Sequence, residues 1–289
     1  MTVRKRWSAA LVTGATDGIG RAVAHRLAGM VDTLLVHGRG ARSVMDLAAA
    51  LAPAHPGTTI IPLKADLCSM AEIHYMINRV CTAVDQLDIV VNNAGTAGIY
   101  PRTVTRDGNE ATLQVNYLAP VMITAGLFDL LCLAEHGRVV NVTCDSYRNA
   151  KLRWHDLSLE QRYHPMTAYA QSKLAVVLHT QGLADRLSAS SCDAVCVNPG
   201  NADTKLHRRA FGWHAESVTG AVDNVLYAIT APLDGTGFYF NRKELTTPAV
   251  ELFRPHVQRH LDRVTAGLLS TRLPWLERVH VHLPRSTAS

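Results

Sequence analysis

The sequence predicts one α/β domain built on a doubly wound parallel sheet of about seven strands, with helices on both faces. Three observations predict this fold. Short apolar runs alternate with helix-like stretches, a glycine-rich turn follows the first apolar run, and small or amide residues follow several later ones. The 289 residues suit one large domain, and the 47% that are hydrophobic can fill a sizeable core.

Composition narrows the classes of function. The net charge is +5, but the basic residues are scattered, which gives weak support for an anionic ligand and none for a nucleic acid. The six cysteines lack metal-site spacing and suggest a reducing compartment, and the histidines form no ligand set, so we expect no metal. Because no uninterrupted apolar run reaches 18 residues, we expect a cytoplasmic protein without a membrane anchor.

The first predicted strand, residues 9–12, runs into a glycine-rich turn and then a helical pattern. This order offers backbone N–H groups and a helix N-terminus to a phosphate. The spacing is G-x-x-x-G-x-G rather than G-x-G-x-x-G, so the turn alone is also compatible with an ordinary loop. The candidate cofactor-binding residues in it are Gly14, Thr16, Asp17, Gly18, Ile19 and Gly20.

The second predicted strand, residues 33–37, ends in Gly38 and Arg39. In dinucleotide-binding folds an acidic residue after this strand binds the ribose hydroxyls, whereas an arginine accommodates a 2′-phosphate. There is no Asp or Glu here, so Arg39, with Arg42 as a second candidate, favours NADP(H). The competing interpretation is a surface arginine.

Three further strands, at 59–63, 87–91 and 138–143, each end in candidate ligand-binding residues. Small and amide residues at the carboxyl end of a strand mark where an α/β sheet places its ligand. We expect helices at 69–84 and at roughly 109–134, the second of which carries Asn116. The residues that follow the three strands are Asp66 and Leu67; Asn92, Asn93, Ala94 and Gly95; and Cys144, Asp145 and Ser146.

Tyr169 and Lys173 lie four positions apart, which puts them on one face of a predicted helix. A tyrosine at its ordinary pKa of ~10 is a poor proton shuttle at neutral pH, and a nearby ammonium lowers that pKa. Such a phenol can give a proton to a carbonyl oxygen or take one from an alcohol. Alone, the pair also fits a solvated helix face.

The last part of the domain has a strand at 194–197, a helix at 217–230 and a strand at 237–240. Between them, residues 201–216 mix basic and aromatic side chains and are expected to form a lid over the substrate. A solvated loop is the alternative. The residues that suggest a flat or anionic substrate are Arg208, Arg209, Phe211 and Trp213.

Together these motifs resemble the short-chain dehydrogenases/reductases over roughly residues 7–265. The residues that carry the resemblance are Thr13, Gly14, Gly18 and Gly20, Asp66, Asn92 to Gly95, Asn116, Tyr169 and Lys173, Asn198 to Gly200, and Thr204. The stretches His155-Asp156-Leu157 and Arg162-Tyr163, in a long segment before the tyrosine, resemble the retinol-dehydrogenase-type branch. Bacterial ketoreductases that finish aromatic natural products resemble the same branch.

We expect a single Rossmann-type domain over residues 1–270, and the weak helical pattern of residues 271–289 suggests a loose C-terminal tail. The resemblance implies that Tyr169 is the general acid/base and that Lys173 tunes it and holds the nicotinamide ribose. Asn116 would position a water, Asp66 would face the adenine, and Thr204 and Asn92 would lie near the nicotinamide. The implied cofactor-binding set is Gly14, Thr16, Asp17, Gly18, Ile19, Gly20, Arg39, Asp66, Leu67, Asn93, Ala94, Gly95, Tyr169, Lys173, Pro199, Gly200 and Thr204.

One position departs from the family pattern. The second serine of a pair that closes the fifth strand is the family's catalytic serine, and here that pair is Thr143-Cys144. A thiol is a weak hydrogen-bond donor. Three interpretations stay open: Ser146 or Thr143 supplies the hydroxyl, Cys144 serves as a weak donor, or redox activity is lost or replaced by another reaction.

We therefore expect an NADP(H)-dependent oxidoreductase that reduces a ketone or oxidises a secondary alcohol, on an aromatic or polyketide-like small molecule of secondary metabolism. The alternative is a non-redox cyclase, dehydratase or epimerase on the same fold, which Cys144 keeps open. A nucleotide-sensing binding protein is disfavoured, because the chain keeps Tyr169, Lys173 and Asn116. The expected partner is a small molecule, with no nucleic acid and no membrane. The family's frequent dimers and tetramers leave room for a homo-oligomer.

Overall fold

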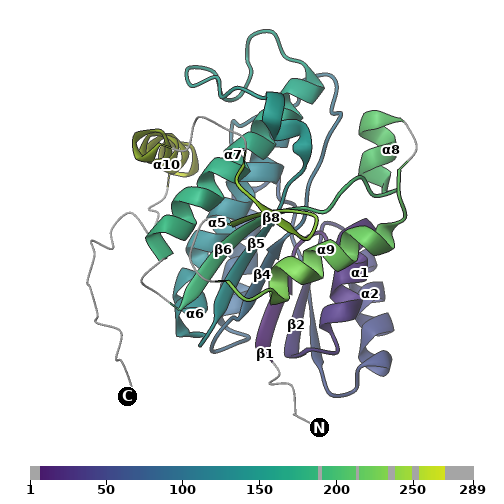
Figure 1. Ribbon diagram of the computed structural model, residues 1–289. Coiled ribbons are helices and arrows are strands. Elements are labelled where there is room, and N and C mark those ends of the chain that lie inside the picture. The colour runs from purple at the N-terminus through teal and green to yellow at the C-terminus, as the bar shows by residue number, and fades with distance from the viewer. Residues whose placement is uncertain (1–6, 188–190, 213–214, 234–237, 249–253, 271–289) are drawn as a thin grey trace, which may run out of the picture.

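The computed structural model describes residues 7–187, 191–212, 215–233, 238–248 and 254–270, and within these ranges one sheet of eight strands forms the centre of the molecule. The strand order is β3-β2-β1-β4-β5-β6-β7-β8, with every pairing parallel except the last, between β7 and β8. Helices cover both faces (Figure 1). The single-domain, doubly wound α/β fold is confirmed, whereas the expected tail at 271–289 lies outside the described residues.

The strands begin and end close to where the apolar runs predict. They are β1 (Trp7–Val12), β2 (Val31–Gly38), β3 (Thr59–Lys64), β4 (Ile89–Asn92), β5 (Gly137–Val142), β6 (Cys192–Asn198), β7 (Phe238–Asn241) and β8 (Glu244–Thr246). β8 is the strand beyond the expected seven. It has three residues and pairs antiparallel with β7. Its residues are not buried, so the sequence has no apolar run there that would predict a strand.

The helical segments lie in the connections between strands, except for α10, which follows β8. They are α1 (Gly18–Leu27), α2 (Ala41–Ala54), α3 (Met70–Cys81), α4 (Ala111–Leu113), η1 (Gln114–Leu118), α5 (Ala119–Gly126), α6 (Phe128–Leu133), η2 (Asp145–Asn149), α7 (Pro165–Leu187), α8 (Lys205–Phe211), α9 (Val218–Thr230) and α10 (Pro255–Leu269).

The sheet separates two apolar layers because parallel strands are buried on both faces. In β1, Leu11 packs into the layer that holds α3, α5 and α7, whereas Ala10 and Val12 pack into the layer that holds α1, α2 and α9. This alternation follows from the two-residue period of a strand. The glycine turn leaves the sheet between β1 and β4, where the strand order reverses, and ligands bind at such switch points.

The single helix expected at roughly 109–134 is wrong in detail. The segment is divided into α4, the π-helical turn η1, α5 and α6. Pro120 near the start of α5 has no N–H to continue the helical bonding, and η1 absorbs the change. Asn116, the predicted catalytic amide, lies in that π-helical turn.

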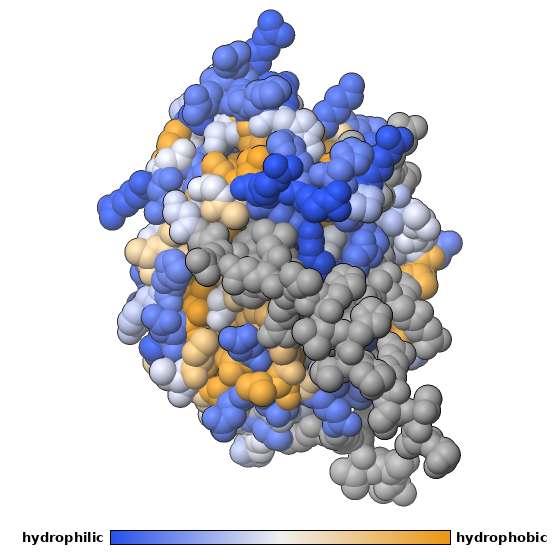
Figure 2. Space-filling model, turned by 90° about the vertical axis from the view of Figure 1, so that its left-hand side faces the viewer, coloured by the Kyte–Doolittle hydropathy of each residue, from blue (hydrophilic) through white to orange (hydrophobic). Residues whose placement is uncertain are grey.

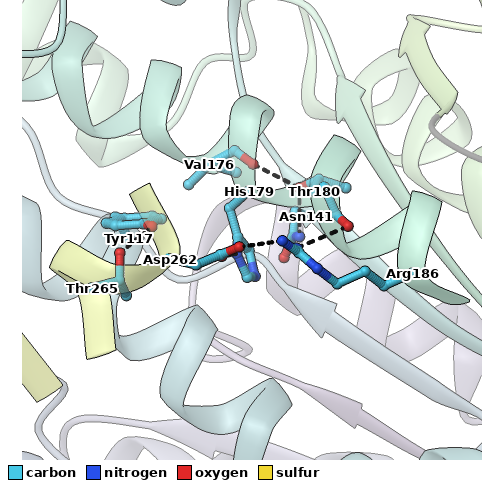
Figure 3. Close-up of polar contacts among 9 residues, drawn as sticks. Tyr117, Asn141, Val176, His179, Thr180, Arg186, Asp262 and Thr265 are labelled. Atoms are coloured by element: carbon cyan, nitrogen blue, oxygen red, sulfur yellow. Dashed lines mark hydrogen bonds and ion pairs between the residues drawn. The ribbon is translucent and has the colours of Figure 1, made fainter. Parts of the chain in front are cut away.

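The C-terminal helix α10 is anchored to α7 and to η1 through polar side chains (Figure 3). Asp262 is 2% exposed, and its carboxylate accepts a hydrogen bond from Arg186 Nη2 at 2.5 Å. Thr265 Oγ1 hydrogen-bonds Tyr117 OH at 2.6 Å. His179 Nδ1 lies 4.0 Å from Asp262 Oδ1. Because these groups have lost water, their mutual contacts fix where α10 sits.

Seen from the side that carries α10, the surface mixes hydrophilic and hydrophobic residues (Figure 2). Within the described ranges, no helix is both long and apolar enough to cross a membrane. All six cysteines are free thiols.

His179 makes stability sensitive to acid. Burial and then the charge of Arg186 lower the pKa of His179 from 6.5 to about 3, so the folded state keeps a neutral ring. The unfolded chain takes up a proton below its ordinary pKa, so stability is complete above pH 6.5 and falls as pH drops towards 3. The slope from this residue is at most about 1.4 kcal/mol per pH unit. His179→Gln should flatten the decline, measured by urea unfolding between pH 7.5 and 5.

His136→Gln is the matched control, because the side chain of His136 is 83% exposed. It should keep the steep acid decline of the parent. Equal pH dependence in the His179 and His136 variants would contradict the buried neutral imidazole.

Candidate active site

The predicted site residues gather at one edge of the sheet, because the carboxyl ends of parallel strands meet there. The glycine turn follows β1, Arg39 follows β2, Asp66 follows β3, Asn93 follows β4 and Cys144 follows β5. Tyr169 and Lys173 come from α7, which packs against β6 and η2.

The glycine turn is held so tightly that side chains would not fit. Gly14 and Gly18 have φ of +64° and +52°. A Cβ on Gly18 would lie 2.9 Å from Thr204 Cγ2, and one on Gly20 would lie 2.3 Å from the carbonyl oxygen of Gly14. The first turn of α1 carries no acidic residue, so its N-terminal amides can face an anion. The turn fits the diphosphate of a dinucleotide.

His37 is a supporting residue that the sequence patterns did not single out. Its Nδ1 accepts a hydrogen bond from Gly14 N at 3.2 Å, and its Nε2 lies 3.0 Å from the carbonyl oxygen of Ala65. The first contact makes Nδ1 an acceptor, so Nε2 carries the proton. Burial lowers the pKa of His37, which keeps the ring neutral. His37 thereby ties the glycine turn to the loop that holds Asp66, and only its place as a polar residue at the end of an apolar strand could have signalled this.

Arg39 and Asp66 lie in neighbouring loops at the β3 end of the sheet. Arg39 is exposed and follows Gly38, against which Thr16 Cγ2 packs so closely that a Cβ would lie 2.4 Å away. Burial and then Asp66 raise the pKa of the Cys68 thiol to about 11, and the charge of Arg39 opposes this rise. Asp66 Oδ1 accepts a hydrogen bond from Cys68 N at 3.0 Å. A guanidinium therefore borders the turn on the Asp66 side.

The residues after β4 divide between the turn and the core. Asn93 Nδ2 donates to the carbonyl oxygen of Thr13 at 3.0 Å and that of Gly14 at 3.3 Å. The amides of Asn93 and Ala94 both donate to Thr13 Oγ1. Asn92, expected near the nicotinamide, instead donates to Asn141 Oδ1 at 2.8 Å inside the core. The alternation of β4 turns Asn92 inwards, so it supports the sheet.

Tyr169, Lys173 and Asn116 come together in the buried part of the site. Tyr169 is 5% and Lys173 6% exposed. Lys173 Nζ lies 5.8 Å from the centre of the Tyr169 ring and donates to the carbonyl oxygen of Val142 at 3.0 Å. Asn116 Nδ2 donates to Ser172 Oγ at 3.0 Å, which links the π-helical turn to α7. Gly95 lies beside this cluster, since a Cβ there would be 3.4 Å from Asn116 Oδ1.

The protonation of this cluster differs from the expectation. Burial raises the pKa of Tyr169 well above its ordinary value, and the neighbouring Cys144 raises it further. Burial lowers the pKa of Lys173, against the opposing effect of Cys144 and Cys196. Desolvation is thus stronger here than the attraction between phenolate and ammonium, and Tyr169 holds its proton.

Cys144 lies in the position where the resemblance expects a serine. It precedes η2 in extended backbone and lies close enough to Tyr169 to raise the pKa of the phenol. Thr143 is buried, and its hydroxyl has no hydrogen-bond partner among the described residues. Ser146 lies two residues further along the chain, half-buried in η2. Among these three residues, Cys144 is the one that raises the pKa of Tyr169.

The predicted lid contains the helix α8, which reaches over Tyr169. The Phe211 ring meets the Tyr169 ring edge-on, with centroids 6.0 Å apart, and His207 lies 5.1 Å from Phe211. Arg208 makes two hydrogen bonds to Asp203, at 2.6 and 2.9 Å, so its charge is already compensated. Arg209 is exposed, and Trp213 lies outside the described residues.

The loop after β6 joins the lid to the rest of the site. Gly200, with φ of +88°, donates from its amide to Asn198 Oδ1 at 3.1 Å. Asn198 Nδ2 donates to Asp145 at 2.8 Å, and the Pro199 carbonyl oxygen accepts from Asn224. The Asn198 contact binds this loop to the segment that follows Cys144. In the described part of the chain, no three His, Cys, Asp or Glu residues form a group that could hold a metal ion.

Residues 8–215 match the family described as short chain dehydrogenase. The chain belongs to this oxidoreductase family. Polyprenol dehydrogenase of Homo sapiens is 31% identical over 255 residues, which cover 81% of this chain and 77% of that protein. Retinol dehydrogenase 12 of Homo sapiens is 32% identical over 200 residues, which cover 69% of this chain and 63% of that protein, less than two thirds of its length.

The fold comparison agrees. A solved structure of an uncharacterised protein from Mycobacterium Paratuberculosis matches with a TM-score of 0.77 and 25% identity, over 93% of this chain and 96% of that chain. The expected membership of the short-chain dehydrogenases, on the retinol-dehydrogenase side of the family, is confirmed.

Proposed function

We propose that this protein is an NADP(H)-dependent oxidoreductase that interconverts a ketone and a secondary alcohol on an aromatic or polyketide-like small molecule of secondary metabolism, in the cytoplasm. The observation that carries the proposal is the buried trio of Tyr169, Lys173 and Asn116 at the same sheet edge as the glycine turn. The names of polyprenol dehydrogenase and retinol dehydrogenase 12 support oxidation or reduction at an alcohol carbon.

The residues of the chain fit a nicotinamide dinucleotide. Gly14, Gly18 and Gly20 leave room for its diphosphate at the N-terminus of α1, and Arg39 offers a guanidinium for a 2′-phosphate. When bound, this cofactor supplies or accepts the hydride. The protein orients the substrate, excludes water and moves the proton.

Tyr169 is suited to donate that proton. Its raised pKa keeps the phenol protonated at neutral pH, ready for the oxygen of a ketone as negative charge develops there. The buried ammonium of Lys173, 5.8 Å from the ring, then lowers the cost of the phenolate left behind. The initial protonation state favours the reductive direction.

Cys144 provides a second donor to the substrate oxygen in this proposal. Its place between β5 and η2 and its effect on the pKa of Tyr169 support a position near the reacting oxygen. A thiol donates weakly, so Tyr169 carries more of the stabilisation than in an enzyme with a hydroxyl there. The same substitution favours the second candidate function, a non-redox cyclase, dehydratase or epimerase that keeps the nucleotide in place.

Tyr169→Phe tests the acid/base role. It keeps the ring and removes the dissociable proton, so ketone-dependent oxidation of NADPH should fall by at least about a hundredfold with cofactor affinity nearly unchanged. Lys173→Ala should weaken both, because the ammonium serves the phenolate and the ribose. Absorbance assays with a panel of aromatic ketones, together with cofactor titrations, measure the two effects. Substantial ketone reduction by Tyr169→Phe would sink the proposal.

Arg39→Asp tests the cofactor preference. Replacing the guanidinium with a carboxylate should weaken NADPH binding by more than about tenfold and make NADH the preferred ligand. Arg42→Asp is the comparison variant and should leave the preference in place, because Arg42 lies within α2, whereas Arg39 directly follows β2. Calorimetric titration of both cofactors decides the matter, and equal affinities in the parent would contradict the proposal.

Three variants separate the roles after β5. Cys144→Ser should preserve or raise the rate of ketone reduction, because a hydroxyl is the better donor. Cys144→Ala should lower it, and Ser146→Ala should be mild. The assays follow cofactor oxidation and product mass. The opposite order for the two alanine variants would transfer the donor role to Ser146. Ketone reduction appearing only in Cys144→Ser, with a parent that changes substrate mass without oxidising NADPH, would favour the non-redox function.

A further inference from the structure

The helix α8 meets the glycine turn through the residues at its start. Thr204 caps α8 by accepting a hydrogen bond from His207 N at 3.1 Å, and its methyl group packs on Gly18. The next residue, Lys205, extends its ammonium to 3.3 Å from Asp17 Oδ2. A cation on the lid is therefore held beside the turn where a diphosphate is expected.

The Asp17 carboxylate lies at the N-terminus of α1 but does not cap that helix. Asp17 is the N-cap residue of α1, yet its side chain makes no capping hydrogen bond. The N-terminus of a helix attracts anions, so a bound diphosphate would compete with the Asp17 carboxylate for the same positive field. Lys205 lies within ion-pair distance of that carboxylate, so a modest side-chain movement could carry its charge from Asp17 to the competing anion.

Arg208, a second cation on α8, is engaged with another carboxylate. Arg208 is held by its two hydrogen bonds to Asp203. Lys205, by contrast, has one exposed ion pair, with side chains that are 83% and 52% exposed, and such pairs contribute little stability. The cost of releasing Lys205 from Asp17 is therefore small compared with a charge-assisted contact to a phosphate.

We propose that Lys205 leaves Asp17 to bind the diphosphate of the nucleotide cofactor, which makes it a cofactor-binding residue supplied by the lid. The inference rests on the proposed function, since it uses the same cofactor site. It also links two ends of a seven-residue helix: Lys205 meets the cofactor at the first position, and Phe211 covers Tyr169 at the last. Cofactor binding then holds Phe211 over the catalytic phenol.

Calorimetric titration of the parent, Lys205→Gln and Lys205→Arg tests this. NADPH should bind Lys205→Gln about five- to tenfold more weakly, and Lys205→Arg should recover most of the loss because it restores the charge. Adenosine 2′-monophosphate, measured by competition, should bind all three equally, because it lacks the diphosphate. Arg209→Gln, an exposed charge lost from the same helix, is the matched control and should bind NADPH as the parent does.

Each outcome decides one question. Parent-like NADPH affinity in Lys205→Gln overturns the inference. If Lys205→Gln loses as much affinity for adenosine 2′-monophosphate as for NADPH, the inference is also overturned, because Lys205 would then contact the 2′-phosphate. An equal loss of NADPH affinity in Arg209→Gln overturns it as well, because any positive charge on α8 would then have the same effect. A parent that binds NADH and NADPH equally contradicts the proposed cofactor preference, yet a loss of both in Lys205→Gln still upholds the diphosphate contact. Thermal unfolding of each variant verifies that it is folded.

Discussion

The close packing of the turn between β1 and α1 is the constraint on which the rest of the site depends. Gly14 lies against Ala94, Gly18 against Thr204 and Gly20 against the carbonyl oxygen of Gly14, at distances that a Cβ would not allow. Three separate parts of the chain, the turn, the β4 loop and the start of the lid, thus converge on one helix N-terminus. Their convergence creates a place for an anion that no single segment could provide.

Desolvation then sets the chemistry beside that place. The apolar layer around α7 excludes water from Tyr169 and Lys173. The phenol therefore keeps its proton, and the lowered pKa makes the Lys173 amine a weaker base. Asn116 is fixed to α7 through Ser172, and the adjacent Tyr117 is fixed to α10 through Thr265. The C-terminal helix, which lies beyond the matched residues 8–215, therefore braces the turn that carries Asn116.

The sequence was sufficient for features that depend on local pattern. Buried parallel strands are continuous apolar runs, and the four-residue spacing of Tyr169 and Lys173 puts them on one helix face. The sequence was insufficient where contacts between residues far apart in the chain determine the local structure. The π-helical turn at Asn116, the core position of Asn92 and the tie between His37 and Gly14 each depend on neighbours far along the chain. The raised pKa of Tyr169 likewise follows from burial, which spacing does not reveal.

The central claim is that Tyr169 donates a proton to a ketone oxygen during hydride transfer, although a thiol, Cys144, lies where the family has a serine. It is tested most directly by mass spectrometry of products formed with NADPH deuterated at the transferable position of the nicotinamide. The account predicts a product that carries one deuterium on the carbinol carbon, formed in step with NADPH oxidation, and lost with Tyr169→Phe. A product formed without deuterium and without cofactor oxidation would contradict it.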